Sequence, residues 1–179
     1  MTTYSLENPF PEYGYFGSEY FCDREQETEQ LTEALLNGSN VTLMAPRRIG
    51  KTGLIHHAFE RIKAKHKRAQ CFYVDIFPTK TFNQMVEFIA NAVMGKLDTP
   101  SQTLKRKLNN LLTALRPTMT PDSITGMPTF SFTIAPEDAR QTLQQVFEYM
   151  KESELPCYLA IDEFQQISNY NEIGADAFI

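Results

Sequence analysis

A short segment in the first third of the chain combines glycine, lysine and threonine at a spacing that could bind phosphate. The segment reads Ala45, Pro46, Arg47, Arg48, Ile49, Gly50, Lys51, Thr52 and Gly53. Its first eight residues follow the spacing G-x-x-x-x-G-K-[ST], with alanine in place of the first glycine. Alanine is tolerable there because the following Pro46 favours an extended backbone at Ala45.

The chemistry of this segment follows from a loop that joins a strand to a helix. In such a loop, successive backbone N–H groups point into a concave nest that suits an anion. Gly50 lets the backbone approach closely, Lys51 reaches the β- and γ-phosphates as a catalytic group, and the Thr52 hydroxyl can ligate Mg²⁺. We interpret residues 45–53 as a phosphate-binding loop. The simpler alternative is a tight helix start with a solvated lysine.

Two adjacent carboxylates follow an apolar run late in the chain. Asp162 and Glu163 come directly after residues 157–161, which predict a buried strand. At the carboxyl end of a strand the first acid can hold Mg²⁺, directly or through water, and the second can polarise an attacking water. Adjacent strand residues point to opposite faces, so the two acids have different roles unless the backbone turns there. An ordinary polar strand end is the alternative.

The nucleotide class is indicated by motifs that the sequence lacks. Guanine-specific proteins usually carry D-x-x-G together with N-K-x-D or T-K-x-D, and neither pattern occurs here. The nearest segment, residues 79–82, fails at the acidic position. ATP is therefore favoured over GTP.

Strands and helices alternate around these motifs. We predict strands at 41–45, 71–76 and 157–161, and helices at 24–37, 50–67, 81–96 and 137–151. Asp23 is the expected N-cap of the first helix, and Thr81 can cap the third. Such alternation predicts an α/β fold, a parallel sheet with helices on both faces.

Two further segments lie outside this alternation. Residues 1–21 are rich in aromatics, glycine and proline, and are expected to form a packed loop. Residues 97–135 are expected to be an insertion, with a leucine stripe typical of an amphipathic helix and then a hairpin appended to the main sheet.

Composition limits the classes of partner and compartment. The 179 residues include 17 basic and 22 acidic ones, a net charge of −5, which argues against a nucleic-acid duplex as the main partner of this segment. Neither a membrane span nor a signal peptide is expected, which predicts a cytoplasmic protein. Cys22, Cys71 and Cys157 form no C-x-x-C pair, so a zinc or redox site is not expected.

Three blocks of sequence together resemble a known family. The blocks are Phe21-Cys22-Asp23-Arg24-Glu25, the loop 45–52 and Ile161-Asp162-Glu163-Phe164-Gln165. They resemble the archaeal-type ATPases, AAA+/STAND-like P-loop proteins of the ASCE class. The whole chain then corresponds to the N-terminal part of a P-loop ATPase domain. Its expected parts are an aromatic nucleotide-proximal loop (1–22), the P-loop half (23–96), the insertion (97–135), and a helix with the Walker B strand (136–179).

The resemblance also implies roles for residues outside the two motifs. The backbone of the F-x-x-R-E block approaches the adenine in relatives, which would place Phe21, Cys22 and Arg24 near the base. Arg47 and Arg48 would border the phosphates, and whether they contact nucleotide or a partner stays open.

The family's sheet order raises one difficulty. It places a further strand, carrying a polar γ-phosphate sensor, between the phosphate-loop strand and the Asp162–Glu163 strand. Only sixteen residues, 164–179, follow Glu163. A missing central strand would leave backbone groups unpaired, so we expect that the chain is a fragment or that another segment fills the gap. The sensor, any arginine finger and the C-terminal region of relatives are expected to lie elsewhere.

Three functions are compatible with these features. The first is a regulatory domain that binds and hydrolyses ATP, with Thr52 and Asp162 at the metal, and Glu163 orienting water. The second is a nucleotide-gated module that presents different surfaces to a protein or DNA partner in its ATP and ADP states, without significant hydrolysis. A small-molecule phosphotransferase is a weaker third, because it needs a mobile basic lid. The sequence does not define the oligomeric state.

Overall fold

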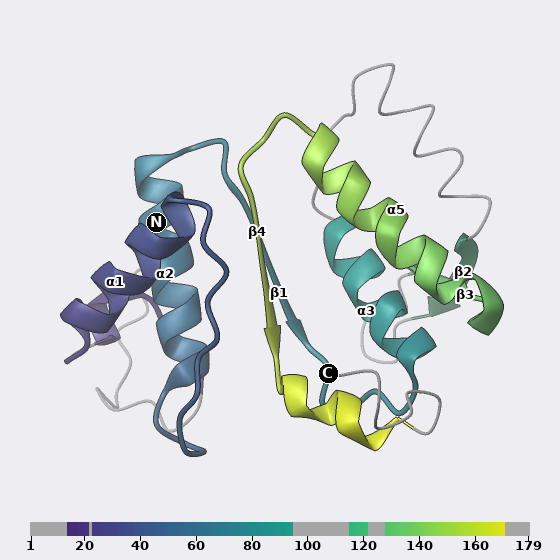
Figure 1. Cartoon of the computed structure of the whole chain (residues 1–179), viewed down its shortest axis with the longest axis horizontal. Coiled ribbons are helices and arrows are strands. Elements are labelled where there is room, and N and C mark those ends of the chain that lie inside the picture. Colours follow the sequence, from purple (N-terminus) through teal and green to yellow (C-terminus); the bar gives the residue numbers. More distant parts are fainter. Residues whose placement is uncertain (1–13, 22, 95–114, 122–127, 171–179) are drawn as a thin grey trace. The chain divides into compact units, whose positions relative to one another are not determined.

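The fold is described from a computed structural model, which describes residues 14–21, 23–94, 115–121 and 128–170, with the side chains of 115–132 left out. The chain divides into two compact units, residues 1–69 and residues 70–179 (Figure 1).

The first unit contains two helices, with one loop before the first helix and another loop between the two. A short 3-10 helix, η1 (Ser18–Tyr20), precedes α1 (Glu25–Leu36), and α2 (Lys51–Lys65) follows the loop that ends at Gly50. The two helices bury an apolar cluster of Leu31, Leu54 and Ala58. Both helices were predicted from their periodicity, and α2 begins directly after the glycine expected to start it.

The start of α1 differs from the expectation. Arg24, not Asp23, is the N-cap residue, and its side chain makes no capping hydrogen bond. Asp23 has a φ of 69°, a left-handed conformation that aspartate tolerates better than most residues. Asp23 therefore turns the chain before the helix, and the first helical bond runs from the Thr28 N–H to the Arg24 carbonyl at 2.9 Å.

The strand expected at 41–45 does not form. Residues 39–46 have no regular secondary structure, and Val41 and Met44 are exposed. A strand exists only through backbone bonds to a neighbour, and no strand among the described residues pairs with this segment. The apolar composition of this segment favours an extended backbone. Whether the segment becomes a strand depends on hydrogen bonds to another strand that is distant in sequence.

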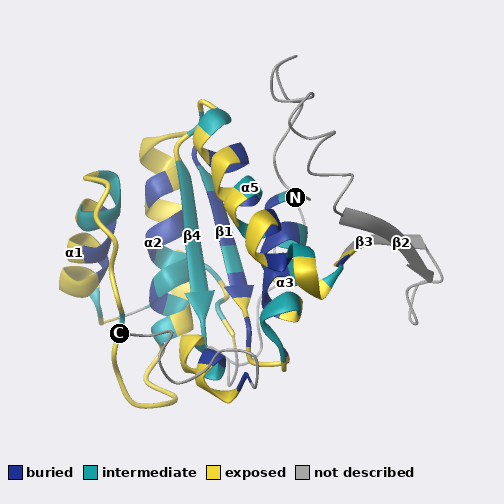
Figure 2. Cartoon of the chain, turned by 45° about the vertical axis from the view of Figure 1, so that its right-hand side comes forward, coloured by how far each residue is buried: buried dark blue, intermediate teal, exposed yellow. Residues whose placement is uncertain are grey.

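The second unit is built on a two-stranded parallel sheet. Strand β1 (Gln70–Asp75) pairs with β4 (Cys157–Asp162), in a register from Gln70 opposite Cys157 to Asp75 opposite Asp162. β1 is largely buried, whereas β4 is half-buried along its length (Figure 2). The parallel pairing confirms the α/β fold class, and both strands were predicted within one residue of their observed ends.

Two helices pack against one face of this sheet. They are α3 (Phe82–Met94) and α5 (Ala139–Glu152), the latter preceded by the 3-10 turn η2 (Pro136–Asp138). Their apolar sides enclose Phe72 and Val74, alternate residues of β1, and Ile76, which directly follows the strand. Thr81 caps α3 as expected, because its hydroxyl oxygen accepts a hydrogen bond from the Gln84 N–H at 3.2 Å.

A hairpin lies between these two helices in sequence. Strands β2 (Leu115–Pro121) and β3 (Pro128–Ile134) pair antiparallel in a sheet of their own. The hairpin was predicted, but its attachment to the main sheet was wrong, since among the described residues no backbone ladder joins β2 or β3 to β1 or β4. The expected leucine-rich helix lies outside the described residues.

A polar cluster closes the carboxyl end of the parallel sheet. The 3-10 helix η3 (Phe164–Asn169) follows β4. The buried Thr79 side chain bonds to the Tyr170 hydroxyl, and the Gln166 amide donates to the Thr79 carbonyl at 2.8 Å. These bonds tie the segments that follow β1 and β4 together, and they support the turn that carries Glu163.

Candidate functional site

The loop before α2 ends in a left-handed turn. Gly50 is the N-cap of α2 with a φ of 78°, a left-handed conformation that costs most other residues strain. Arg48 is also left-handed, with a φ of 62°. Turns of this kind aim successive N–H groups to one side, next to the positive end of the helix dipole.

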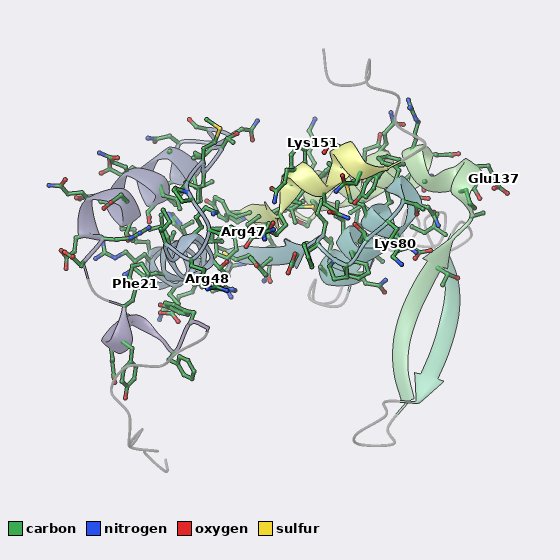
Figure 3. The ribbon with its side chains drawn as sticks, turned by 90° about the horizontal axis from the view of Figure 1, so that it is seen from below. Phe21, Arg47, Arg48, Lys80, Glu137 and Lys151 are labelled. Atoms are coloured by element: carbon green, nitrogen blue, oxygen red, sulfur yellow. The ribbon has the colours of Figure 1, made fainter. Side chains whose placement is uncertain are left out.

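Lys51 folds back over this loop. Its ammonium Nζ donates to the carbonyl oxygens of Ala45 at 2.9 Å and Pro46 at 3.0 Å. The positive charge is therefore held at the loop. Arg47 and Arg48 extend from the same loop (Figure 3) and are exposed.

The Phe21 ring packs on the start of α2. A Cβ atom at Gly53 would lie 3.3 Å from Phe21 Cε2, closer than ordinary contact, so glycine at 53 makes room for the ring. One turn further along α2, the His57 ring stacks on Phe21 with centroids 4.5 Å apart. Phe21 is therefore packed against α2, the helix that follows the loop ending at Gly50.

A cavity of about 440 Å³ opens beside this contact. Its lining includes Phe21, Asp23, Arg24, His57, Glu60 and Arg61. Phe21 and Arg24 were expected near a nucleotide base, and both line it, while Cys22 lies outside the described residues. His57 follows Lys51 by six residues, so this part of the cavity wall lies about 9 Å along the helix from its start.

A hydrogen-bonded chain crosses from the aromatic segment to α2. The Tyr15 hydroxyl donates to Glu60 Oε2 at 2.7 Å and lies 3.0 Å from His57 Nδ1. Burial raises the pKa of Tyr15, and the bond to Glu60 adds to the rise because it favours the protonated phenol. Burial, and then the charge of Arg61, lower the pKa of His57. The family resemblance implied that the aromatic segment is near the nucleotide, but it did not identify these two residues, since Tyr15 and His57 lie 42 positions apart.

The acidic pair lies in the second unit, at the end of β4. Asp162 Oδ2 accepts a hydrogen bond from the Tyr73 hydroxyl at 2.7 Å, and Oδ1 accepts one from the Glu163 N–H at 2.9 Å. Glu163 has a φ of 55°, so the backbone turns sharply here. The turn ends the strand alternation, and the Gln165 amide donates to the Glu163 carboxylate.

A third carboxylate adjoins the pair in the sheet. Asp75 lies opposite Asp162 in the register, at the end of β1. Asp75 Oδ1 accepts a hydrogen bond from the Phe77 N–H at 2.8 Å, so this side chain stabilises the turn after β1. Among the described residues, no group of three or more His, Cys, Asp and Glu side chains could hold a metal ion.

The predicted site residues therefore fall into two sets. The loop residues, Phe21 and Arg24 belong to the first unit, and Asp162 and Glu163 belong to the second. A threonine hydroxyl and a carboxylate are hard oxygen donors of the kind that Mg²⁺ takes alongside nucleotide phosphates. The chemistry of Thr52 and Asp162 fits that ion.

The fold and these motifs define the class of the protein as an α/β domain of the P-loop nucleoside-triphosphatase type. The model of one family, described as an ATPase domain predominantly from Archaea, matches residues 21–176. The chain belongs to this family, whose members bind and hydrolyse nucleotides. No curated protein and no solved structure was found to match the chain. Among the described residues, no helix is both long and apolar enough to cross a membrane.

Proposed function

We propose that this chain binds Mg-ATP at residues 45–53 and hydrolyses it as a regulatory domain. The observation that carries the proposal is the arrangement at the start of α2. Gly50 is left-handed at the helix N-terminus, and the Lys51 ammonium is folded onto the carbonyls of Ala45 and Pro46. A helix N-terminus and a lysine held at its loop are the two features that bind nucleotide phosphates in this class.

Each residue has a role that its chemistry supports. The backbone N–H groups of the loop bind the β-phosphate, and Lys51 moves from its carbonyl partners to the β- and γ-phosphates. Thr52 and Asp162 hold Mg²⁺, which when bound neutralises charge that develops on the phosphates. Glu163 accepts a hydrogen bond from the attacking water and orients it. Arg24, with the backbone at Phe21 and Cys22, borders the base, and Arg47 and Arg48 border the phosphates.

The test of binding is a thermal-shift titration with Mg-ATP and Mg-ADP. Ligand at about 100 times its dissociation constant adds roughly 2.7 kcal/mol to the free energy of unfolding, which raises the melting temperature measurably. We expect this rise in the parent chain and its loss in Lys51→Ala. Lys63→Ala, an exposed change in the last turn of the same helix, is the matched control. An equal rise in Lys51→Ala would contradict the proposed site.

The test of hydrolysis is Glu163→Gln, which keeps the shape of the side chain and removes its charge. We expect phosphate release to fall by a factor of about 10² or more, while the ATP-induced melting shift persists. The control is Glu154→Gln, an exposed acid in the turn before β4. Unchanged turnover in Glu163→Gln would refute the catalytic role.

One observation favours a second candidate, a nucleotide-gated interaction module without significant hydrolysis. The Glu163 carboxylate accepts a hydrogen bond from the Gln165 amide within the same turn. A carboxylate engaged in this way binds a water less readily, so turnover depends on an event that releases it. Gln165→Ala discriminates the two candidates: faster phosphate release supports the module, and an unchanged rate supports ordinary hydrolysis.

A further inference from the structure

The Tyr15 hydroxyl fixes the proton arrangement of His57. A phenol hydroxyl can donate only one hydrogen bond, and here it donates to the Glu60 carboxylate, the acceptor at 2.7 Å. The contact between Tyr15 and His57 Nδ1, at 3.0 Å, must then be an N–H donated by the imidazole to the phenol oxygen. With the proton on Nδ1, the second ring nitrogen of a neutral His57, Nε2, is an acceptor.

Two further features hold the imidazole in this state. Its ring stacks on Phe21 with an interplanar angle of 23°, which restricts rotation of the side chain. Burial and the charge of Arg61 lower the pKa of His57, so the ring is neutral at pH 7. His57 also lines the cavity of about 440 Å³ beside the start of α2. The imidazole that lines this cavity thus has one nitrogen, Nε2, left as a hydrogen-bond acceptor.

We propose that His57 is the residue that selects adenine, by accepting a hydrogen bond at Nε2 from the 6-amino group of the base. The inference rests on the proposed nucleotide site. Adenine presents a donor at position 6, whereas guanine and hypoxanthine present a carbonyl oxygen, which is an acceptor. Two acceptors facing each other in a cavity exclude a hydrogen bond and leave both lone pairs unsatisfied.

The charged groups around the cavity make the proposal sharply testable. Arg24 and Arg61 also line it, and arginine is the usual partner of a purine 6-oxo group. If an arginine made the hydrogen bond to position 6 of the base, inosine triphosphate would bind at least as well as ATP. If His57 reads it, ATP binds better.

The experiment measures binding of ATP and of inosine triphosphate, each with Mg²⁺, to the whole chain by isothermal titration calorimetry. We expect ATP to bind about tenfold more tightly, the effect of one hydrogen bond gained and one acceptor clash avoided. In His57→Ala the ratio of the two dissociation constants should fall to within about twofold. Tyr15→Phe, which keeps the ring and removes only the hydroxyl, should also reduce the ratio, because Nδ1 is then no longer held as the protonated nitrogen. His66→Ala, an exposed histidine just after α2, should leave it unchanged.

The ratio of the two dissociation constants distinguishes a specific role of His57 from a structural one, since a damaged site would weaken the binding of both nucleotides equally. Lys51→Ala is run in parallel to separate the two proposals. If neither nucleotide binds, or if both bind independently of Lys51, the proposed function fails and the inference with it. If binding depends on Lys51 but the ratio is near one in the parent chain, or unchanged in His57→Ala, the inference alone is overturned.

Discussion

Tyr73→Phe removes a single hydroxyl and tests whether the two parallel strands position the acid at the end of β4. The Tyr73 hydroxyl donates to Asp162 Oδ2 at 2.7 Å, across the pairing of β1 with β4. A hydrogen bond to a charged group contributes about 1.5–3 kcal/mol to the free energy of unfolding. Both side chains are half-buried, so water takes over part of the lost bond, and we expect a loss of about 1 kcal/mol. That loss lowers the melting temperature of a chain of this length by roughly 2–4 °C.

The measurement is urea denaturation followed by circular dichroism, with Tyr158→Phe as the control. Tyr158 lies on β4 and is also half-buried, and the same change there leaves the bond to Asp162 intact. A stability of Tyr73→Phe equal to that of the parent chain would refute the reasoning.

The same variant also tests the proposed metal role of Asp162. Loss of a group that orients a metal ligand lowers metal affinity by about 10–100-fold. Asp162 keeps its bond from the Glu163 N–H, so we expect the lower end of that range. The readout is Mn²⁺ binding in the presence of ATP, measured by electron paramagnetic resonance. Unchanged Mn²⁺ affinity would show that Tyr73 does not position the carboxylate for a metal.

Three further predictions follow from the packing and from the ionisable groups. Phe72→Ala should lower the free energy of unfolding by about 3–5 kcal/mol in urea denaturation, because the ring is fully buried between the sheet and the helices; a loss below about 1 kcal/mol would contradict that packing. Gly50→Ala should cost about 1–2 kcal/mol and abolish the ATP-induced melting shift, because alanine is strained at a φ of 78°; an unchanged shift would argue against the loop geometry. The pKa of His57 is lowered in the folded state, so its contribution to stability is complete above the ordinary histidine pKa of 6.5 and is lost as the pH falls through the lowered folded-state pKa. Between pH 7 and pH 5 the melting temperature of His57→Gln should therefore fall less than that of the parent chain. Parallel curves for the two proteins would refute this.

The sequence predicted those parts of the fold whose signals are local. The helix after Gly50 and the helices around Phe82 and Val146 have apolar periodicity over many residues, and the strand before Asp162 is a continuous apolar run. The spacing of glycine, lysine and threonine is also a local signal, because it involves only a few neighbouring positions. Each of the three blocks that resemble the family is likewise short.

Errors arose where a local signal depends on a distant partner. The run 41–45 has the composition of a strand, but an extended segment becomes a strand only when another backbone pairs with it. The hairpin after Leu115 was recognised from its turn residues, whereas the sheet to which it belongs is a long-range property. Asp23 is a favourable capping residue by type, yet it adopts a left-handed conformation, and the N-cap is the next residue, Arg24.

For the site, the sequence by itself determined which groups exist and their order along the chain: Lys51 after a glycine, and Asp162 followed by Glu163 after an apolar run. Only the tertiary structure decided what holds them. Tyr73 meets Asp162 across 89 positions and Tyr15 meets His57 across 42, and the proton on the imidazole depends on both Tyr15 and Glu60. Contacts of this kind leave no periodic trace in the sequence, because they depend on how the strands and helices pack together.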